Sequence, residues 1–153
     1  MYAVVRLRST MKTKPAIKTT LGLLSLTRVN HCTLVQSTPN YGGMLQVVKD
    51  YIAYGEVDAD AIEELLVHRA ELAGGRKLTE EYLKEHTPLS SIRELAEKLA
   101  AGDIMLRDIP ALKPILRLHP PRKGHSGIKK TYQQGGVLGY HGKDISKLLH
   151  RMR

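Results

Sequence analysis

The sequence contains no phenylalanine and no tryptophan, and its seven aromatic residues are all tyrosines. A core built from this chain must therefore rest on Leu, Ile, Val, Met and Ala, which is sufficient for a modest core in 153 residues. At roughly 100 to 200 residues per domain, this length predicts one compact domain or a small domain with an extension.

Cysteine is almost absent, because Cys32 is the only one. No intramolecular disulfide can form, and a zinc finger or ribbon lacks the clustered thiolates that it needs. Cys32 lies in a run rich in β-branched residues, which favours a small buried hydrophobic residue over a nucleophile. We expect no metal site, no cofactor and a reducing, cytoplasmic environment.

Long hydrophobic runs are also missing. The longest stretch without Lys, Arg, Asp or Glu runs from Val29 to Val48 and contains Asn, His, Gln, Pro and a Gly pair, so it does not predict a membrane span. Arg6 and Arg8 lie where a secretory signal needs its apolar centre. We therefore expect a chain that is neither secreted nor embedded in a membrane.

Acidic residues are scarce at both ends of the chain. Residues 1–55 hold seven basic residues and one acid, and residues 113–153 hold ten and one, whereas residues 56–112 hold seven and thirteen. The formal net charge of +9 points to a polyanionic partner. We expect these three segments to be distinct units, with both basic ones sharing a polyanion-facing side and the acidic one facing solvent or another protein. The alternative is an uneven solvated surface with no such role.

The first 55 residues alternate between strand and helix patterns. Strands are predicted at Tyr2 to Leu7, Val29 to Gln36 and Tyr51 to Gly55, where apolar and β-branched residues concentrate. Between them, one helix begins at Pro15 and a second is capped by Asn40. The order β-α-β-α-β predicts a two-layer α+β sandwich.

The acidic segment shows helical patterns. Asp58 or Asp60 is expected to cap a helix that Gly74-Gly75 ends, and Ser91 with Glu94 forms a capping box for another. Carboxylates early in helices compensate the helix dipole, so paired acid-base chemistry is the less favoured interpretation.

The C-terminal segment changes character again. A fourth strand is predicted at Ile115 to Leu118, but residues 119–142 are rich in Gly, Pro, Lys and Arg and show no apolar period. We expect an extended basic tail that an external scaffold must hold. Apolar residues at helical spacing from Ile145 to Met152 predict a terminal helix.

Several side chains are candidates for contact with phosphates or bases. Basic pairs flank a Gly-rich stretch, and glycine lets a backbone approach phosphates closely. Histidines and a tyrosine can stack on bases, although the tyrosine also fits the apolar stripe of a helix. No acid or thiolate completes a metal site with the histidines. These candidates are Arg122, Lys123, Lys129, Lys130, His119, His125 and Tyr41.

No catalytic motif accompanies them. Gly124 to Gly127 lacks the spacing of a hydrolase nucleophile elbow, and no Gly-Lys-Ser/Thr phosphate loop is present. The basic segments offer only Asp50 and Asp144 as carboxylates for a metal-dependent nuclease. Binding without catalysis, and without a small-molecule substrate, is favoured.

Four motifs carry a resemblance to a known family: RVNHCTLV from Arg28, TPNYGGM from Thr38, YGE from Tyr54 and LRLHPPRKGHSGIK from Leu116. In this order the sequence resembles the archaeal large-subunit ribosomal proteins of the L-thirty family, which are similar to eukaryotic L-seven. The resemblance implies a ferredoxin-like N-terminal domain with a three-stranded antiparallel sheet. It also implies a structural constituent of the large (50S) ribosomal subunit that binds ribosomal RNA, contacts neighbouring ribosomal proteins and supports assembly and translation.

Together, the charge pattern and the resemblance predict a set of RNA-binding residues in the N-terminal domain and the tail. The set is Arg6, Arg8, Lys12, Lys14, Lys18, Arg28, His31, Tyr41, His119, Arg122, Lys123, His125, Lys129, Lys130 and Lys143. Two alternatives stay open. One is an RNA-processing enzyme with Glu80 or Glu81 as a catalytic carboxylate, and the other is a DNA-compacting basic protein.

Overall fold

A computed structural model describes residues 1–153 and places one five-stranded sheet at the centre of the molecule. Its strands lie in the order β4-β2-β1-β3-β5, and every neighbouring pair is antiparallel except β3 and β5. The predicted strands are present, but the sheet has five strands rather than three, because two short C-terminal strands extend its edges. The bounds are β1 Tyr2–Arg6, β2 His31–Val35, β3 Ile52–Glu56, β4 Leu116–Arg117 and β5 Gly139–Tyr140.

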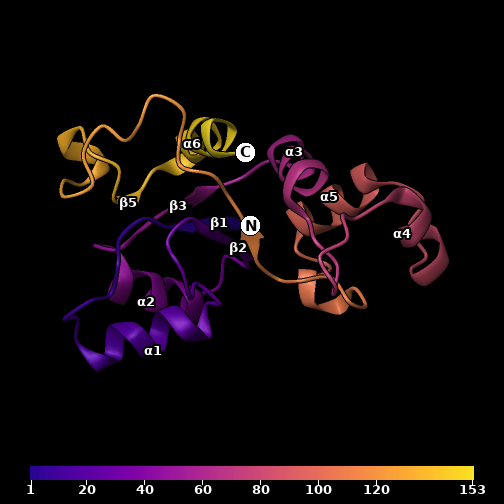
Figure 1. Ribbon diagram of the computed structural model, residues 1–153, viewed down its shortest axis with the longest axis horizontal. Coiled ribbons are helices and arrows are strands. Elements are labelled where there is room, and N and C mark those ends of the chain that lie inside the picture. The colour runs from indigo at the N-terminus through magenta and orange to yellow at the C-terminus, as the bar shows by residue number, and fades with distance from the viewer.

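Helices α1 (Pro15–Leu23) and α2 (Pro39–Val48) cover one face of the sheet (Figure 1). The N-cap of α2 is Thr38, whose side chain accepts a hydrogen bond from the Tyr41 amide, so the prediction that Asn40 caps this helix is wrong. Proline suits the first helical position because its nitrogen has no hydrogen to donate, and with Pro39 there the helix starts two residues earlier than an Asn40 cap would give. The core on this face is Val4, Leu21, Leu24, Leu26, Val35, Leu45, Val48, Ile52 and Tyr54.

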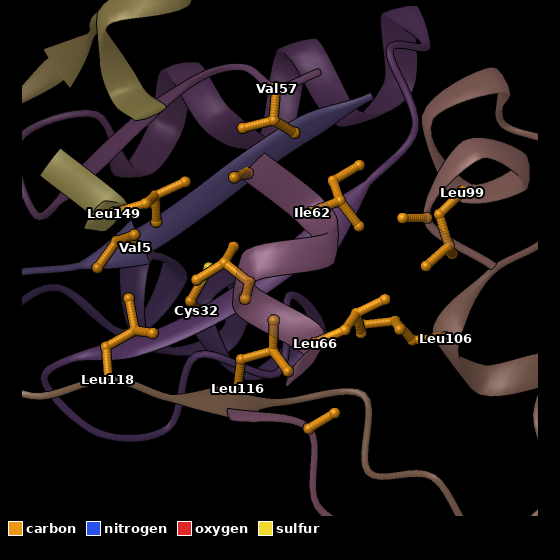
Figure 2. Packing of buried hydrophobic residues seen from close by; sticks show 14 of the residues in the cluster. Val5, Cys32, Val57, Ile62, Leu66, Leu99, Leu106, Leu116, Leu118 and Leu149 are labelled. Atoms are coloured by element: carbon orange, nitrogen blue, oxygen red, sulfur yellow. The ribbon is translucent and has the colours of Figure 1, made fainter. Parts of the chain in front are cut away.

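The second face of the sheet is covered as well, by α3 (Ala59–Arg69) and α6 (Ile145–Met152), with α5 (Ile92–Ala101) packed against α3 (Figure 1). Figure 2 shows side chains from the sheet, α3 and the C-terminal residues meeting there. The expected two-layer sandwich is therefore a three-layer arrangement. Strand β1 is buried on both faces, with Val4 directed to one core and Val5 to the other, so both faces need a cover.

Cys32 belongs to this second core and is fully buried, as its sequence context predicted. Burial raises the pKa of its thiol to about 12, which leaves it protonated and unreactive. All three charge segments contribute to the same cluster of 29 buried residues. Their division at residues 55 and 112 rests on charge and stays a prediction.

The acidic segment holds α3, α4 (Glu80–His86) and α5. Helix α3 ends at Arg69 instead of at Gly74-Gly75, because those glycines, with φ of +89° and +81°, turn a hairpin bridged between Glu71 and Lys77. This prediction of the helix end was wrong. None of the helices in the structure combines the length and the apolar character needed to cross a membrane.

The capping box of α5 is half confirmed. The Ser91 hydroxyl accepts a hydrogen bond from the Glu94 amide, but the Glu94 carboxylate accepts from the amide and hydroxyl of Ser90 instead of from Ser91. These bonds, with Lys98 nearby, lower the pKa of Glu94 to about 2. Gly102 ends the helix with its backbone in the left-handed region.

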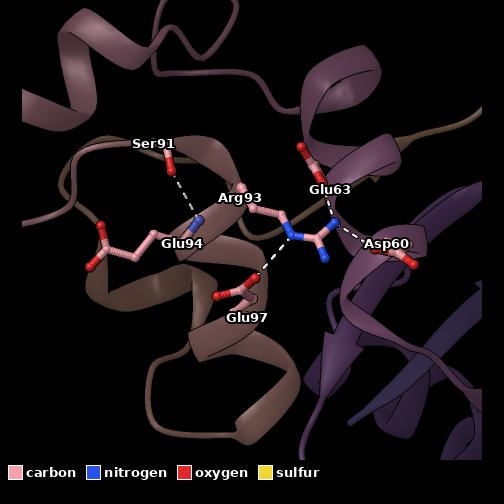
Figure 3. A network of polar contacts seen from close by, with 6 residues as sticks. All are labelled: Asp60, Glu63, Ser91, Arg93, Glu94 and Glu97. Carbon is pink, nitrogen blue, oxygen red and sulfur yellow. Dashed lines mark hydrogen bonds and ion pairs between the residues drawn. The ribbon is translucent and has the colours of Figure 1, made fainter.

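Ion pairs connect α5 to α3 on the solvent side (Figure 3). The Arg93 guanidinium donates to Asp60 at 2.5 Å, to Glu63 at 2.8 Å and to Glu97 at 2.9 Å. Asp60 and Glu63 thus join α3 to α5, whereas Glu97 pairs within α5. Glu80 and Glu81 occupy the exposed first turn of α4. No group of three or more potential metal ligands gathers anywhere in the structure.

Candidate nucleic-acid interface

Charge is separated between the two ends of the sheet. Strand β1 ends where β2 and β3 begin, and β4 runs toward the same end, because Arg6 lies opposite Ile52 and His31 lies opposite Arg117. We call this the basic end. It collects the loop after β1, the turn before β2, the exit of β4 and the residues before β5, which hold Arg8, Lys12, Lys14, Arg28, Arg117, Lys129 and Lys130.

The opposite end of the sheet carries acids instead. There Tyr2 lies opposite Glu56, and the chain continues into Asp58 and Asp60 at the start of α3. In Figure 1 the acidic helices lie to the right of the sheet, and the tail residues before β5 lie to its left. The cations of the loop after β1 and of the tail lobe therefore lie at the other end of the sheet from these acids.

Arg6 does not face solvent, although it was predicted to contact RNA. It is only 6% exposed, and its guanidinium donates to the carbonyls of Leu26 (2.9 Å), Thr27 (2.6 Å) and Arg8 (3.0 Å) and to the Thr10 hydroxyl (3.0 Å). Burial lowers its pKa from the usual value. A guanidinium already occupied by four acceptors does not fit the predicted phosphate contact, and Arg6 instead ties the turn before β2 to the end of β1.

We expect Arg6→Lys to reduce the free energy of unfolding by about 2 kcal/mol, because one ammonium cannot donate both to the carbonyls of Leu26 and Thr27 and to that of Arg8. Urea unfolding of the full chain measures this loss. Arg8→Lys is the matched control, since Arg8 makes a single side-chain hydrogen bond, and it should change stability by less than about 0.5 kcal/mol. Equal stability of the two variants would contradict the structural role of Arg6.

His31 is also inside the protein. It is 6% exposed, its Nδ1 lies 3.3 Å from the Thr27 hydroxyl, and burial lowers its pKa, with smaller contributions from Arg117, Arg28 and Arg6. A buried imidazole is poorly placed for the predicted RNA contact. The exposed cations of the same sheet end, Arg28 and Arg117, are better placed.

The loop after β1 presents its cations to solvent. Lys12 and Lys14 are exposed, and Lys18 lies one helical turn further along α1. Arg8 is held in place, because its guanidinium donates to the Asp50 carbonyl at 3.1 Å and lies 5.2 Å from the centre of the Tyr51 ring. The end of α2 is thereby connected to this loop.

Much of the tail folds on its own chain instead of remaining extended. We call residues 127–138 the tail lobe. Within it, the amide of Val137 donates to the Gly127 carbonyl (3.1 Å) and the amide of Leu138 to the Lys130 carbonyl (3.2 Å). Gly136 is required, since a Cβ there would lie 2.1 Å from the Lys130 carbonyl oxygen. Glycines that suggested an extended chain therefore close a compact loop that exposes Lys129 and Lys130.

The lobe is anchored beside the sheet by His141. This buried imidazole hydrogen-bonds the Val137 carbonyl through Nε2 (2.9 Å), and the Tyr132 ring stacks on it at 4.1 Å. The Tyr132 hydroxyl in turn donates to Asp144 at 2.8 Å. Residues of the lobe and of the end of α2, including Lys49, line a shared pocket, so the lobe adjoins the basic end.

Other predicted residues lie elsewhere. Tyr41 is half-buried at the start of α2, against the core near the acidic end, and Lys143 follows β5 away from the basic end. Arg122 and Lys123 are exposed beside the end of α6. His119 is exposed, whereas His125 is half-buried with an unpartnered Nδ1, and burial lowers its pKa.

The predicted lysines and arginines share one property: none forms an ion pair with a carboxylate. Except for Arg6, whose guanidinium is enclosed by internal acceptors, their charges are therefore available to an external anion. Lys49 and Arg117 belong to the same surface but were not predicted. Their places in the chain could have indicated them, because Lys49 directly follows α2 and Arg117 ends β4, and the sheet topology brings both of these element ends to the basic end.

Comparison with known proteins identifies the family. Residues 2–52 match the family model described as ribosomal protein L30p/L7e. Over 153 residues and the full length of both chains, the sequence is 54% identical to large ribosomal subunit protein uL30 of Methanoculleus marisnigri, 51% identical to that of Archaeoglobus fulgidus and 49% identical to that of Methanocella arvoryzae. This chain, with its basic sheet end and its C-terminal extension, belongs to the L30p/L7e family of ribosomal proteins.

Proposed function

We propose that this protein is a structural constituent of the large ribosomal subunit and binds large-subunit ribosomal RNA through its basic end. The observation that carries the proposal is the gathering of unpaired, exposed cations from separate segments at one end of the sheet. RNA phosphates would be the anionic partners of these cations, which have none within the protein. Membership of the family supports a cytoplasmic, ribosomal role without catalysis.

The finer assignment is also a proposal. The first 55 residues act as a ferredoxin-like RNA-binding domain, and the tail lobe adds a second set of contacts beside it. The residues in contact are Arg8, Lys12, Lys14, Lys18, Arg28, Lys129 and Lys130, joined by Lys49 and Arg117. The acidic helices, which lie at the far end, face a neighbouring ribosomal protein.

Salt dependence tests this proposal. If six to ten phosphates are contacted, affinity for large-subunit ribosomal RNA should fall by roughly three to five decades between 50 and 200 mM salt, because each contact releases counterions. Filter binding of the full chain to transcribed RNA measures the slope. A nearly flat response would contradict the proposal, and equal affinity for duplex DNA would favour a DNA-compacting role.

A further inference from the structure

A cavity of about 440 Å³ lies where the end of α3 meets the hairpin after it and the C-terminal residues. It is separate from the basic end, and its lining includes residues of the acidic segment that were not candidates for any contact. Only one lining residue is hydrophobic. The lining is His68, Arg69, Ala70, Glu71, Gly75, Lys77, Arg122 and Arg153.

The lining of this cavity is mainly positive, although most of its residues belong to the acidic segment. Four lining side chains are guanidinium or ammonium groups, and Glu71 is the single carboxylate. That carboxylate is already compensated, since it lies 3.1 Å from the ammonium of Lys113. Arg153 pairs with Glu64, which leaves Arg69, Lys77 and Arg122 without a carboxylate partner.

Arg69 provides a second and independent indication. Its Nε is buried, yet no atom of the protein accepts a hydrogen bond from it. Leaving a buried donor without a partner destabilises the folded state. Such a group is normally satisfied by water, an ion or a ligand, and an anion in the adjacent cavity would supply an acceptor.

The walls of the cavity are held in place by backbone hydrogen bonds. In the hairpin, Leu72 donates to the Arg76 carbonyl at 2.7 Å and Leu78 donates to the Ala70 carbonyl at 3.1 Å. On the opposite wall, the Arg122 amide donates to the Arg151 carbonyl at 2.9 Å. The cations are therefore mounted on ordered backbone.

We infer that this cavity binds a backbone phosphate of ribosomal RNA through Arg69, Lys77 and Arg122. The inference rests on the proposed function and extends it to the acidic segment. Arg122 belongs to the basic tail and is followed directly by the exposed Lys123. An RNA strand that follows the tail would place a phosphodiester between α3 and the hairpin, and the acidic segment would then be attached to RNA at this one point.

Charge-neutralising pairs test the inference in the full chain. Lys77→Gln with Arg122→Gln removes two exposed cations of the cavity without cutting into the core. Lys84→Gln with Arg107→Gln is the matched control, since it removes two exposed cations of the acidic segment outside the cavity. The probe is the transcribed large-subunit ribosomal RNA of Methanoculleus marisnigri, the source of a 54% identical relative.

We expect the cavity pair to weaken RNA binding about tenfold and to reduce the salt slope by about 1 to 2, with little change in the control. Ethylation interference should reveal one or two phosphates whose modification weakens binding of the unsubstituted chain but not of the cavity variant. If the cavity pair matches its control while the unsubstituted chain binds RNA, the inference is overturned and the proposed function stands. If the unsubstituted chain shows no salt-dependent binding, both are overturned.

Discussion

Gly55→Ala is expected to lower the free energy of unfolding by about 3 kcal/mol or more, because strand β3 has no room for a side chain at this position. A Cβ there would lie 2.2 Å from the carbonyl oxygen of Gly142 and 2.9 Å from the Cβ of Ile145. Both are firmly placed groups: one belongs to backbone and the other to the fully buried start of α6. The substitution must therefore push α6 away from the sheet.

Gly43→Ala is the matched control for this effect. Gly43 lies within α2, and a Cβ added there would meet nothing within 4 Å. Alanine is favoured over glycine in helix interiors, so this variant should be more stable by up to about 1 kcal/mol. Urea unfolding followed by circular dichroism measures both changes. Comparable stability of the two variants would contradict the packing of the C-terminal helix on the sheet.

Removing four lysines of the basic end should produce the largest loss of RNA affinity. Replacement of Lys12, Lys14, Lys129 and Lys130 by Gln removes two cations from the loop after β1 and two from the tail lobe. Because four phosphates are then no longer neutralised, the slope of log affinity against log salt should fall by roughly 3 to 4. At 100 mM salt we expect binding to large-subunit ribosomal RNA to weaken at least about a hundredfold. The four substitutions should not disturb folding, because all four side chains are exposed.

The control variant removes the same charge from other parts of the surface. Lys84, Lys98, Arg107 and Lys147 all lie outside the basic end, and their replacement by Gln again changes the net charge by four. Lys98 pairs with Glu94 on its own helix and Lys147 pairs with Asp144 just before α6, and ion pairs of this kind near the surface contribute little to stability. Equal RNA affinity of the two quadruple variants would show that only net charge matters, against a located interface.

Local patterns were sufficient to predict the elements of the N-terminal region. β-branched runs mark its strands and the apolar stripe of α2 marks a helix, without reference to distant residues, and the same kind of spacing marks α6 at the C-terminus. What they could not reveal was the cover on the second face of the sheet. Ala3, Val4 and Val5 are consecutive buried residues of β1, a run typical of a strand covered on both sides, whereas the two-layer prediction accounted for only one side.

Glycine in the tail was harder to interpret from the sequence. A Gly-rich segment without an apolar period is typical of extended chain, yet Gly136 is required for close approach of the tail backbone to itself. Gly55 of β3 is required for close approach of the tail backbone to the sheet. Strand β5 consists of only two residues, which is too short for any periodicity to appear. Close backbone contacts between distant segments leave no local signal, so the tail's attachment to the sheet could not be predicted.

Predictions of the candidate site were limited by burial. Arg6 and Arg8 are the same residue type two positions apart in the chain. The guanidinium of Arg6 donates to internal carbonyls, whereas that of Arg8 lies at the surface. The sequence alone offers no way to distinguish the two arginines. The difference arises because the fold brings the carbonyls of Leu26 and Thr27 beside the end of β1, within reach of Arg6. The scarcity of acids in residues 1–55, in contrast, was readable directly, and Arg8, Lys12, Lys14 and Arg28 of this segment lie at the basic end.

Lysine acetylation in intact large ribosomal subunits, read out by mass spectrometry, tests the central claim most directly. The reactivity of each lysine is compared between the free chain and the assembled particle. We predict strong protection of Lys12, Lys14, Lys129 and Lys130 in the particle, because each amine would lie against RNA phosphate. If those amines react equally in both states, the basic end does not bind RNA and the account is wrong.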